Sequence, residues 1–241
     1  MLEAAQTSRS QLNNQIVIGA EAILWEADIA KGYDRRINRL MKRAVDLALA
    51  SAALILLALP MLLIALLIRL DSRGRAIFKQ ARVGRRGQQF TFYKFRTMRA
   101  DNDDAGHRAY VAALITGDKE YGRDRQHKIT DDARVTRIGR WLRLTSIDEL
   151  MQLFNVVKGE MSLVGPRPPL PYEVELYNEH QRRRLLAKPG ITGPWQVSGR
   201  TKVGFSEMIE LDLKYIRRWS IWLDLAIIAR TIPALVKTRG W

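Results

Sequence analysis

The chain has 241 residues, with 40 Lys and Arg against 25 Asp and Glu, and a formal net charge of +15 at pH 7. This length suits one or two domains with a sizeable core. The basic excess favours an anionic partner, namely nucleic acid, an acidic membrane surface or a phosphorylated substrate. The absence of cysteine excludes disulfides and thiolate chemistry, and three scattered histidines give no support to a zinc cluster or a Ser-His-Asp site. Any bound metal would have oxygen ligands, which indicates a hard cation such as Mg²⁺.

Residues 1–41 carry no motif that indicates a function. Within them, residues 16–29 have the apolar spacing of a short amphipathic helix. The start of the chain has no long apolar core, so we do not expect a signal peptide. We therefore treat residues 1–41 as an N-terminal extension of unknown function.

A basic cluster then precedes an almost wholly apolar run from Ala44 to Ile68. About 20 apolar residues suffice for a helix to span a bilayer, so the run is long enough, and a buried helix of a soluble protein is the alternative. Lys and Arg flank both ends, as is typical of cytoplasmic flanks. Pro60 lies deep in the run, where proline removes a backbone donor and kinks a helix. We predict that residues 42–75 enter the membrane, bend at Pro60 and return to the same side.

A β-hairpin with a basic tip is expected next. Residues 76–83 and 88–93 have the pattern of strands, and Gly84-Arg85-Arg86-Gly87 joins them. The tip could contact acidic headgroups or a substrate, and the sequence leaves both open. Beyond it, we expect a helix over 107–115 and a loop over 116–132.

Two adjacent carboxylates, Asp148 and Glu149, form the centre of a stretch that runs from residue 140 to 168. Ser146 and Glu149 fit a capping box, which would place both carboxylates in the first turn of a helix that begins at Ser146. Acidic residues are common there for structural reasons alone. Arg143 and Arg167 on either side favour a further role, because arginines hold phosphate oxygens while a carboxylate attacks phosphorus.

The helix that follows is expected to end at Gly159 and to have a single apolar face. The residues predicted for that face are Leu150, Leu153, Phe154 and Val157. Residues 161–164 then have the pattern of a short strand, and residues 165–168 that of a rigid loop.

The last third of the chain is expected to be mainly helical. We predict a helix over 173–186 with a solvated run at Arg182–Arg184, then a glycine-rich passage that reaches Gly199 and Arg200. A second helix is expected over 205–218. The apolar segment 220–236 is either a core helix or, given the tryptophans near its ends and its basic flanks, a helix at the membrane interface.

Six of these segments together closely resemble the bacterial sugar transferases, the monotopic phosphoglycosyl transferases also known as polyprenyl-phosphate hexose-1-phosphate transferases. The matching segments are Lys94–Met98, Thr145–Leu150, Asn155–Gly159, Met161–Pro168, Lys188–Gly193 and Trp195–Arg200. The resemblance covers residues 42 to the C-terminus. There are two departures: Leu59 stands where the best-known pattern has serine, and Met151 stands where the family commonly has proline.

The resemblance implies an α+β fold, with a re-entrant membrane helix over 42–75 and a small cytoplasmic catalytic domain over 76–241. Interfacial amphipathic helices and a short β-hairpin belong to that domain. The implied location is the bacterial inner membrane, with the catalytic domain facing the cytoplasm and contacting anionic lipids of the inner leaflet.

The resemblance also implies the reaction: a hexose-1-phosphate moves from a UDP-sugar to polyprenyl (undecaprenyl) phosphate, UMP leaves, and exopolysaccharide or another glycoconjugate is initiated. Asp148 would be a covalent nucleophile and Glu149 a base or a ligand of Mg²⁺, with Asp148 as a second candidate ligand. The residues expected to bind substrate phosphate are Lys94, Arg96, Arg143, Arg167, Gly199 and Arg200.

Two other classes of protein remain as alternatives, a non-catalytic basic scaffold at the membrane surface and a membrane-tethered nucleic-acid binder. The second lacks the aromatic interleaving of a recognisable reader, so we expect no nucleic-acid partner. The sequence leaves open the sugar, the glycoconjugate and the oligomeric state, including a homo-oligomer.

Overall fold

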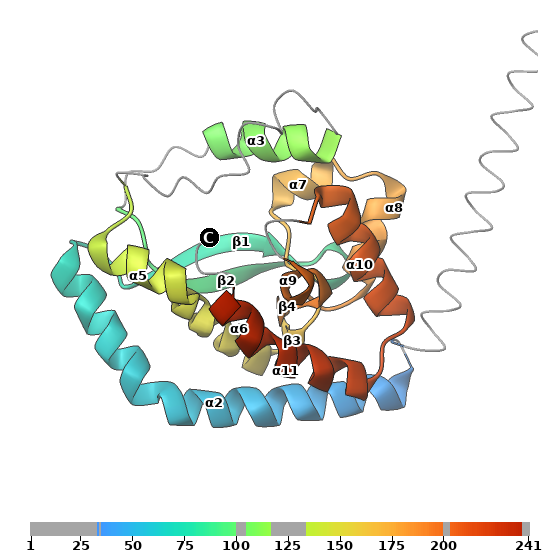
Figure 1. The fold of residues 1–241 in the computed structure, drawn as a ribbon, viewed down its shortest axis with the longest axis horizontal. Helices are drawn as coiled ribbons and strands as arrows, with labels where there is room; N and C mark the ends of the chain where they lie inside the picture. Colours follow the sequence, from blue (N-terminus) through green and yellow to red (C-terminus); the bar gives the residue numbers. More distant parts are fainter. Residues whose placement is uncertain (1–32, 34, 100–104, 117–133, 200–202, 238–241) are drawn as a thin grey trace, which may run out of the picture.

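The computed structural model describes residues 33, 35–99, 105–116, 134–199 and 203–237. Most of these residues are helical, and the strands form two small sheets of two strands each (Figure 1). The helix expected over 16–29, the loop expected over 116–132 apart from residue 116, and Arg200 lie outside these ranges.

The apolar run lies in one long helix, α2 (Arg36–Asp71), which contains Pro60. Since α2 begins at Arg36, the boundary expected at residue 42 falls inside a helix. Figure 1 shows α2 as two limbs that meet at an angle along the lower edge of the molecule. Proline inside a helix is an ordinary cause of such a bend.

By length and composition, α2 is the one helix in the part of the chain described that could cross a membrane. Only 17% of its most apolar window is buried within the protein. Ile55 and Leu56 are each 80% exposed, and Leu62 is 68% exposed. The core helix of a soluble protein would bury such side chains, so this exposure favours an apolar environment around α2.

The expected hairpin is confirmed. Strands β1 (Ile77–Val83) and β2 (Gln89–Phe95) pair antiparallel, with Ile77 opposite Phe95 and Val83 opposite Gln89. The turn η1 (Arg85–Gly87) joins them, and Arg86 there has a left-handed φ of 58°. On one face of the hairpin, Phe92 is buried in a cluster that also contains Ala50 of α2.

The segment that carries the two carboxylates folds differently from the prediction. Helix α5 (Arg137–Thr145) ends at Ser146, which has a left-handed φ of 56° and makes no side-chain capping bond. Asp148 and Glu149 then lie in a 3₁₀ turn, η2 (Ile147–Met151), which leads into α6 (Gln152–Lys158). The predicted capping box is therefore wrong, because Ser146 serves as the left-handed end of the preceding helix.

The 3₁₀ turn also changes which side chains of α6 face the core. Phe154, predicted to be buried, is 42% exposed, whereas Val156 is fully buried. A 3₁₀ turn advances by three residues and an α-turn by 3.6, so a face extrapolated as continuous α-helix drifts out of phase. The predicted end of the helix is confirmed, since Gly159 terminates α6 with a φ of 84°.

The second sheet places the loop that carries Arg167. Strand β3 (Ser162–Val164), as predicted, pairs in parallel with β4 (Gly190–Thr192). Gly165 follows β3 and lies so close to the backbone before β4 that a Cβ atom would meet the Lys188 carbonyl oxygen at 2.3 Å.

The C-terminal third is helical but more broken than expected. Residues 173–186 form three short helices, α7 (Pro171–Glu175), α8 (Glu179–Arg182) and η3 (Arg183–Leu186), in place of one. Asn178 and Gln181 form a capping box that starts a new helix, so the predicted continuous helix is wrong. Arg184 is likewise buried and paired with Asp212 at 2.6 Å, in contrast to the expected solvated run.

Three of the remaining helices agree with the prediction: α3 (Ala105–Thr116), α10 (Phe205–Arg217) and α11 (Ile221–Lys237). The glycine-rich passage was expected to be a loop or a short strand, and it instead contains a short helix, α9 (Pro194–Ser198), after β4. One core cluster joins α10 and α11 to β3, and two others join α2 to the hairpin, α5, η2 and α6. Helix α2 therefore contributes to the core that holds the site as well as presenting apolar side chains outward.

A labelling experiment tests the path of α2. Arg36 and Arg73 lie at its two ends and both are exposed. The chain contains no cysteine, so Arg36→Cys and Arg73→Cys each introduce a single thiol. With a re-entrant path we expect an impermeant maleimide to label both thiols only from the cytoplasmic side of oriented vesicles.

Labelling of the two thiols from opposite sides would establish a spanning helix instead. Pro60→Ala removes the proline and should shift part of the population toward that pattern. Ala65→Pro is the control, since it adds a proline at another position in α2 and leaves Pro60 in place.

Candidate active site

The two carboxylates lie where η2 packs against strand β2. Burial is the main cause that raises the pKa of Asp148 to about 6, and the neighbouring Glu149 carboxylate raises it further. Lys94, Arg143 and Arg167 act in the opposite direction, because positive charge favours the carboxylate form. These three basic residues thus lie close enough to Asp148 to interact with its charge. The sequence analysis predicted that all three bind substrate phosphate.

Lys94 lies on β2 and interacts electrostatically with Asp148. Burial lowers the pKa of the Lys94 ammonium group to about 8, and the nearby Arg143 and Arg82 lower it further, whereas Asp148 raises it. The Nζ atom lies 5.1 Å from the centre of the Phe78 ring, a distance at which the face of the ring attracts a cation. Lys94 is therefore a fixed cation in a partly desolvated site.

Arg143 and Arg167 approach from two other elements. Arg143, in the last turn of α5, donates from Nε to Thr97 Oγ1 at 3.1 Å. Arg167, in the loop after β3, has its Nη1 atom 3.7 Å from Glu149 Oε1. Arg143 and Arg167 thus come from two separate elements, α5 and the loop after β3, and both interact with the charge of Asp148.

Arg82 is a basic residue of this site that the sequence analysis did not identify. Its pKa is lowered to about 10, chiefly by burial and then by Arg167, while Glu149 among others acts to raise it. Arg82 Nη1 donates to the Pro168 carbonyl at 2.8 Å, so it also holds the loop that carries Arg167. The hairpin register contained the signal, because Phe78 pairs with Lys94 and Arg82 lies four residues beyond Phe78 on the same face of β1.

Arg96, which we expected to bind substrate phosphate, instead contacts the C-terminal end of α2. Its guanidinium donates to the carbonyl oxygens of Ser72 at 2.6 Å and Arg73 at 2.9 Å, and to Ser72 Oγ at 2.8 Å. Strand β2 ends at Phe95, so the alternation that would have put Arg96 on the same face as Lys94 no longer applies. The observed contacts give Arg96 a structural role at the C-terminal end of α2.

Gly199 lies at the end of α9 with a φ of 148°, and α9 packs mainly against α10 and α11. Gly199 therefore belongs to the part of the fold formed by α9, α10 and α11, whereas the two carboxylates belong to η2. Arg200, which follows it, is outside the described residues.

The donor set can be compared with the needs of a divalent cation. Within the ranges that the structure describes, no group of three or more His, Cys, Asp and Glu side chains forms a complete protein metal site. Asp148 and Glu149 offer two adjacent carboxylates. That set fits Mg²⁺, which proteins commonly hold with one or two carboxylates together with water and substrate phosphate.

A family model described as "Bacterial sugar transferase" matches residues 37–238, and the chain therefore belongs to the bacterial sugar transferase family. The chain is 46% identical over 200 residues to galactosyl transferase CpsE of Streptococcus agalactiae serotype III, an alignment that covers 83% of this chain and 43% of that protein.

Two further relatives differ in how much of their length is matched. The exopolysaccharide production protein ExoY of Rhizobium meliloti is 39% identical over 209 residues, which cover 87% of this chain and 91% of ExoY. The undecaprenyl-phosphate glucose phosphotransferase of Komagataeibacter xylinus is 44% identical over 216 residues, which cover 84% of this chain and 37% of that enzyme. The chain thus spans less than half of two of these relatives and nearly all of the third.

The structural role of Arg96 leads to a stability prediction. Arg96→Met leaves two backbone carbonyls and Ser72 Oγ without their charged donor, so we expect the free energy of unfolding to fall by about 3 kcal/mol, since hydrogen bonds to charged groups contribute about 1.5–3 kcal/mol. Arg75→Met, at an exposed position nearby, should change it little. Thermal or denaturant unfolding in detergent micelles provides the comparison. Equal stability of the two variants, combined with weaker binding of phosphate ligands by Arg96→Met, would return Arg96 to the phosphate site.

Proposed function

We propose that this chain transfers a sugar-1-phosphate from a UDP-sugar to polyprenyl phosphate, releases UMP and so initiates the synthesis of an exopolysaccharide or another glycoconjugate. The observation that carries the proposal is the half-buried pair Asp148 and Glu149, set among Lys94, Arg143 and Arg167 within a family of sugar transferases. The names of the relatives describe galactosyl transfer, glucose phosphate transfer to undecaprenyl phosphate, and exopolysaccharide production.

The two proposed substrates differ in character, since one is a soluble anion and the other a lipid with a phosphate head. An apolar surface beside a basic site meets this need. Helix α2 presents exposed leucine and isoleucine side chains, while the basic site lies between the hairpin, η2 and the loop after β3. In our proposal α2 enters the cytoplasmic leaflet of the bacterial inner membrane, bends at Pro60 and returns, and anionic lipids contact the basic residues at its ends.

The charges of the site suit a diphosphate. Four cations, Lys94, Arg82, Arg143 and Arg167, face two carboxylates, so two positive charges remain for the donor. Guanidinium groups bind phosphate oxygens in a bidentate fashion, and a partly buried setting strengthens that attraction. In this proposal Arg143, from α5, and Arg167, from the loop after β3, orient the two phosphates.

Asp148 is the proposed nucleophile. With a pKa of about 6, it is about nine-tenths ionised at pH 7. One of its carboxylate oxygens attacks the phosphorus atom that carries the sugar, and the bond from that phosphorus to the bridging oxygen breaks. UMP departs with the electron pair and leaves the sugar phosphate joined to Asp148 as an acyl phosphate. An oxygen of the polyprenyl phosphate then attacks the same phosphorus, and Asp148 leaves as a carboxylate.

Glu149 completes the site in one of two ways. As a base it would accept a proton from the incoming lipid phosphate, and as a ligand it would hold Mg²⁺ together with Asp148 and the donor phosphates. Bound Mg²⁺ would supply neutralisation of the diphosphate charge. In either case the ion pair with Arg167, 3.7 Å long, holds the Glu149 carboxylate to one side of the turn.

The covalent route predicts UMP formation from the donor alone. Purified protein mixed with its UDP-sugar, without lipid, should release at most one equivalent of UMP per active site and gain the mass of a hexose phosphate at Asp148. Asp148→Asn has nearly the same shape but is not a nucleophile, so we expect it to abolish both signals while the protein stays folded and membrane-bound.

Glu149→Gln is the matched control, since it changes the adjacent carboxylate in the same way. We expect slow turnover with some accumulation of the adduct if Glu149 acts mainly as the base of the second step. UMP that forms only once polyprenyl phosphate is present, with the kinetics of a ternary complex, would replace the covalent scheme with direct transfer.

The raised pKa of Asp148 predicts a pH dependence. For UMP formation, kcat/KM for the UDP-sugar should fall as the pH drops through about 6, because protonation of Asp148 removes the nucleophile. The diesterified donor diphosphate does not titrate in this range, so the donor half-reaction isolates the enzyme group.

Two variants should move this acidic limb in opposite directions. Lys94→Met removes a cation that lowers the pKa of Asp148, so the limb should move to higher pH. Glu149→Gln removes a negative charge that raises the same pKa, so the limb should move to lower pH. If the acidic limbs of both variants coincide with that of the wild-type protein, the titrating group is not Asp148.

A further inference from the structure

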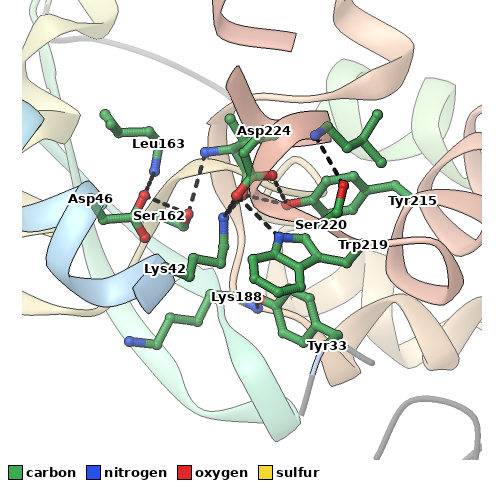
Figure 2. Close-up of polar contacts among 12 residues, drawn as sticks. Tyr33, Lys42, Asp46, Ser162, Leu163, Lys188, Tyr215, Trp219, Ser220 and Asp224 are labelled. Carbon is green, nitrogen blue, oxygen red and sulfur yellow. Dashed lines mark hydrogen bonds and ion pairs between the residues drawn. The ribbon is translucent and has the colours of Figure 1, made fainter. Parts of the chain in front are cut away.

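A buried polar cluster joins three segments that are far apart in the sequence. Lys42 of α2 donates from Nζ to Asp224 Oδ2 of α11 at 2.6 Å and to the Val164 carbonyl oxygen of β3 at 3.0 Å. Figure 2 shows Lys42 reaching Asp224 from the α2 side. Both side chains of this ion pair are almost entirely buried.

Two further side chains complete the surroundings of Asp224. The Tyr215 hydroxyl lies 2.7 Å from Asp224 Oδ1 and 3.1 Å from the Val164 carbonyl oxygen, so its single proton is shared between them. Trp219 Nε1 donates to Asp224 Oδ2 at 3.0 Å (Figure 2). Both carboxylate oxygens therefore have partners, and the Val164 carbonyl lies at the centre of the cluster.

One turn further along α2, Asp46 contacts the same strand. Its Oδ1 atom accepts hydrogen bonds from Ser162 Oγ and from the Leu163 backbone N–H, both at 3.0 Å (Figure 2). Helix α2 thus binds β3 at three consecutive residues, through Asp46 at 162 and 163 and through Lys42 at Val164. The position of this strand is coupled directly to the position of the helix.

Only two residues separate Val164 from Arg167. Gly165 N–H donates to the Thr192 carbonyl at 2.9 Å, and the Pro166 carbonyl accepts from Gly190 N–H at 2.9 Å. The proline ring fixes one backbone torsion, and the close packing of Gly165 removes further freedom. A displacement of Val164 would therefore be passed on to Arg167 and to its contact with Glu149.

We propose that Lys42, Asp224 and Tyr215 are positioning residues that place Arg167 against the Asp148 and Glu149 carboxylates by fixing the carbonyl of Val164. The proposal rests on the function proposed above, because Arg167 is taken to bind donor phosphate. A buried ion pair is weak evidence for stability, since a well-packed apolar pair often stabilises a fold equally well. Its directional bonds to a backbone carbonyl are what an apolar pair would lack, and they specify where that carbonyl lies.

Tyr215→Phe tests the proposal with a small change, because it removes one hydroxyl and keeps the Lys42–Asp224 pair. Tyr33→Phe is the matched control. Tyr33 is buried in the same core cluster, but its hydroxyl accepts from Lys188 N–H at 3.0 Å and has no bond to Val164 or Asp224. We expect Tyr215→Phe to lower kcat for UMP formation about fivefold, and Tyr33→Phe to change it less than about twofold, as interaction energies of hydrogen-bonded neighbours allow.

A double-mutant cycle separates positioning from general stability. Arg167→Lys alone should lower kcat about a hundredfold, as expected for a lost preorganised anion contact. If Tyr215 acts through Arg167, adding Tyr215→Phe to Arg167→Lys should cost little more, whereas adding it to Arg143→Lys should still cost about fivefold. Equal fivefold losses in both backgrounds would overturn the proposal.

Lys42→Met provides a stronger variant, and hydrogen exchange provides a readout that needs no activity. Both Lys42→Met and Tyr215→Phe should speed exchange in the peptide that contains residues 162–167, relative to Tyr33→Phe and to the β1–β2 hairpin in the same sample. Unchanged exchange in that peptide would also overturn the proposal. Wild-type protein that forms no UMP from any UDP-sugar would instead refute the proposed function, and the exchange result would still decide whether the cluster fixes β3.

Discussion

The burial of Asp148 beside Glu149 is the constraint on which the rest of the site depends. Two adjacent carboxylates in a partly desolvated place repel one another, and burial alone disfavours their charged forms. The structure offsets this cost with cations from separate elements, Lys94 on β2, Arg143 on α5 and Arg167 in the loop after β3. Because no single element carries them all, the site requires that the hairpin, α5 and the β3–β4 sheet keep fixed positions relative to one another.

Helix α2 brings these elements together from one side. Its outward side chains are apolar and exposed, while inward ones enter two of the three core clusters. Arg96, which directly follows the strand that carries Lys94, bonds the C-terminal end of α2. The N-terminal half of α2 binds β3 through Lys42 and Asp46. A helix fixed at both limbs to elements that carry site residues couples the apolar surface of the protein to the geometry of the site.

The sequence was sufficient where local pattern decides the structure. Strand alternation and the Gly84–Gly87 turn predicted the hairpin, and Gly159 marked the end of α6 because its left-handed φ suits glycine. It was insufficient where tertiary contacts decide. Ser146 fitted a capping box by type and spacing, yet it terminates α5 instead.

The same limit explains the errors among the basic residues. Arg96 lies two residues after Lys94, a spacing that would put both side chains on one face of a continuous strand. Strand β2 ends at Phe95, however, and Arg96 instead bonds carbonyl oxygens at the C-terminal end of α2. Arg184 belongs to a run of three arginines that suggests a solvated face, yet Asp212, 28 residues further on, gives it a buried partner. Neither partner is visible in a single sequence, because each comes from an element distant along the chain.

The arginines and lysines of this strongly basic chain fall into two groups that differ in what they contact. Several cations serve internal purposes: Arg43 donates to the carbonyls of Val156 and Val157 at the end of α6, and Lys42, Arg96 and Arg184 are buried with protein partners. Charge used in this way fixes backbone carbonyls at the ends of helices and strands. The cations around Asp148 differ, because they face carboxylates and exceed them in number, and that local surplus is what suits a small diphosphate substrate.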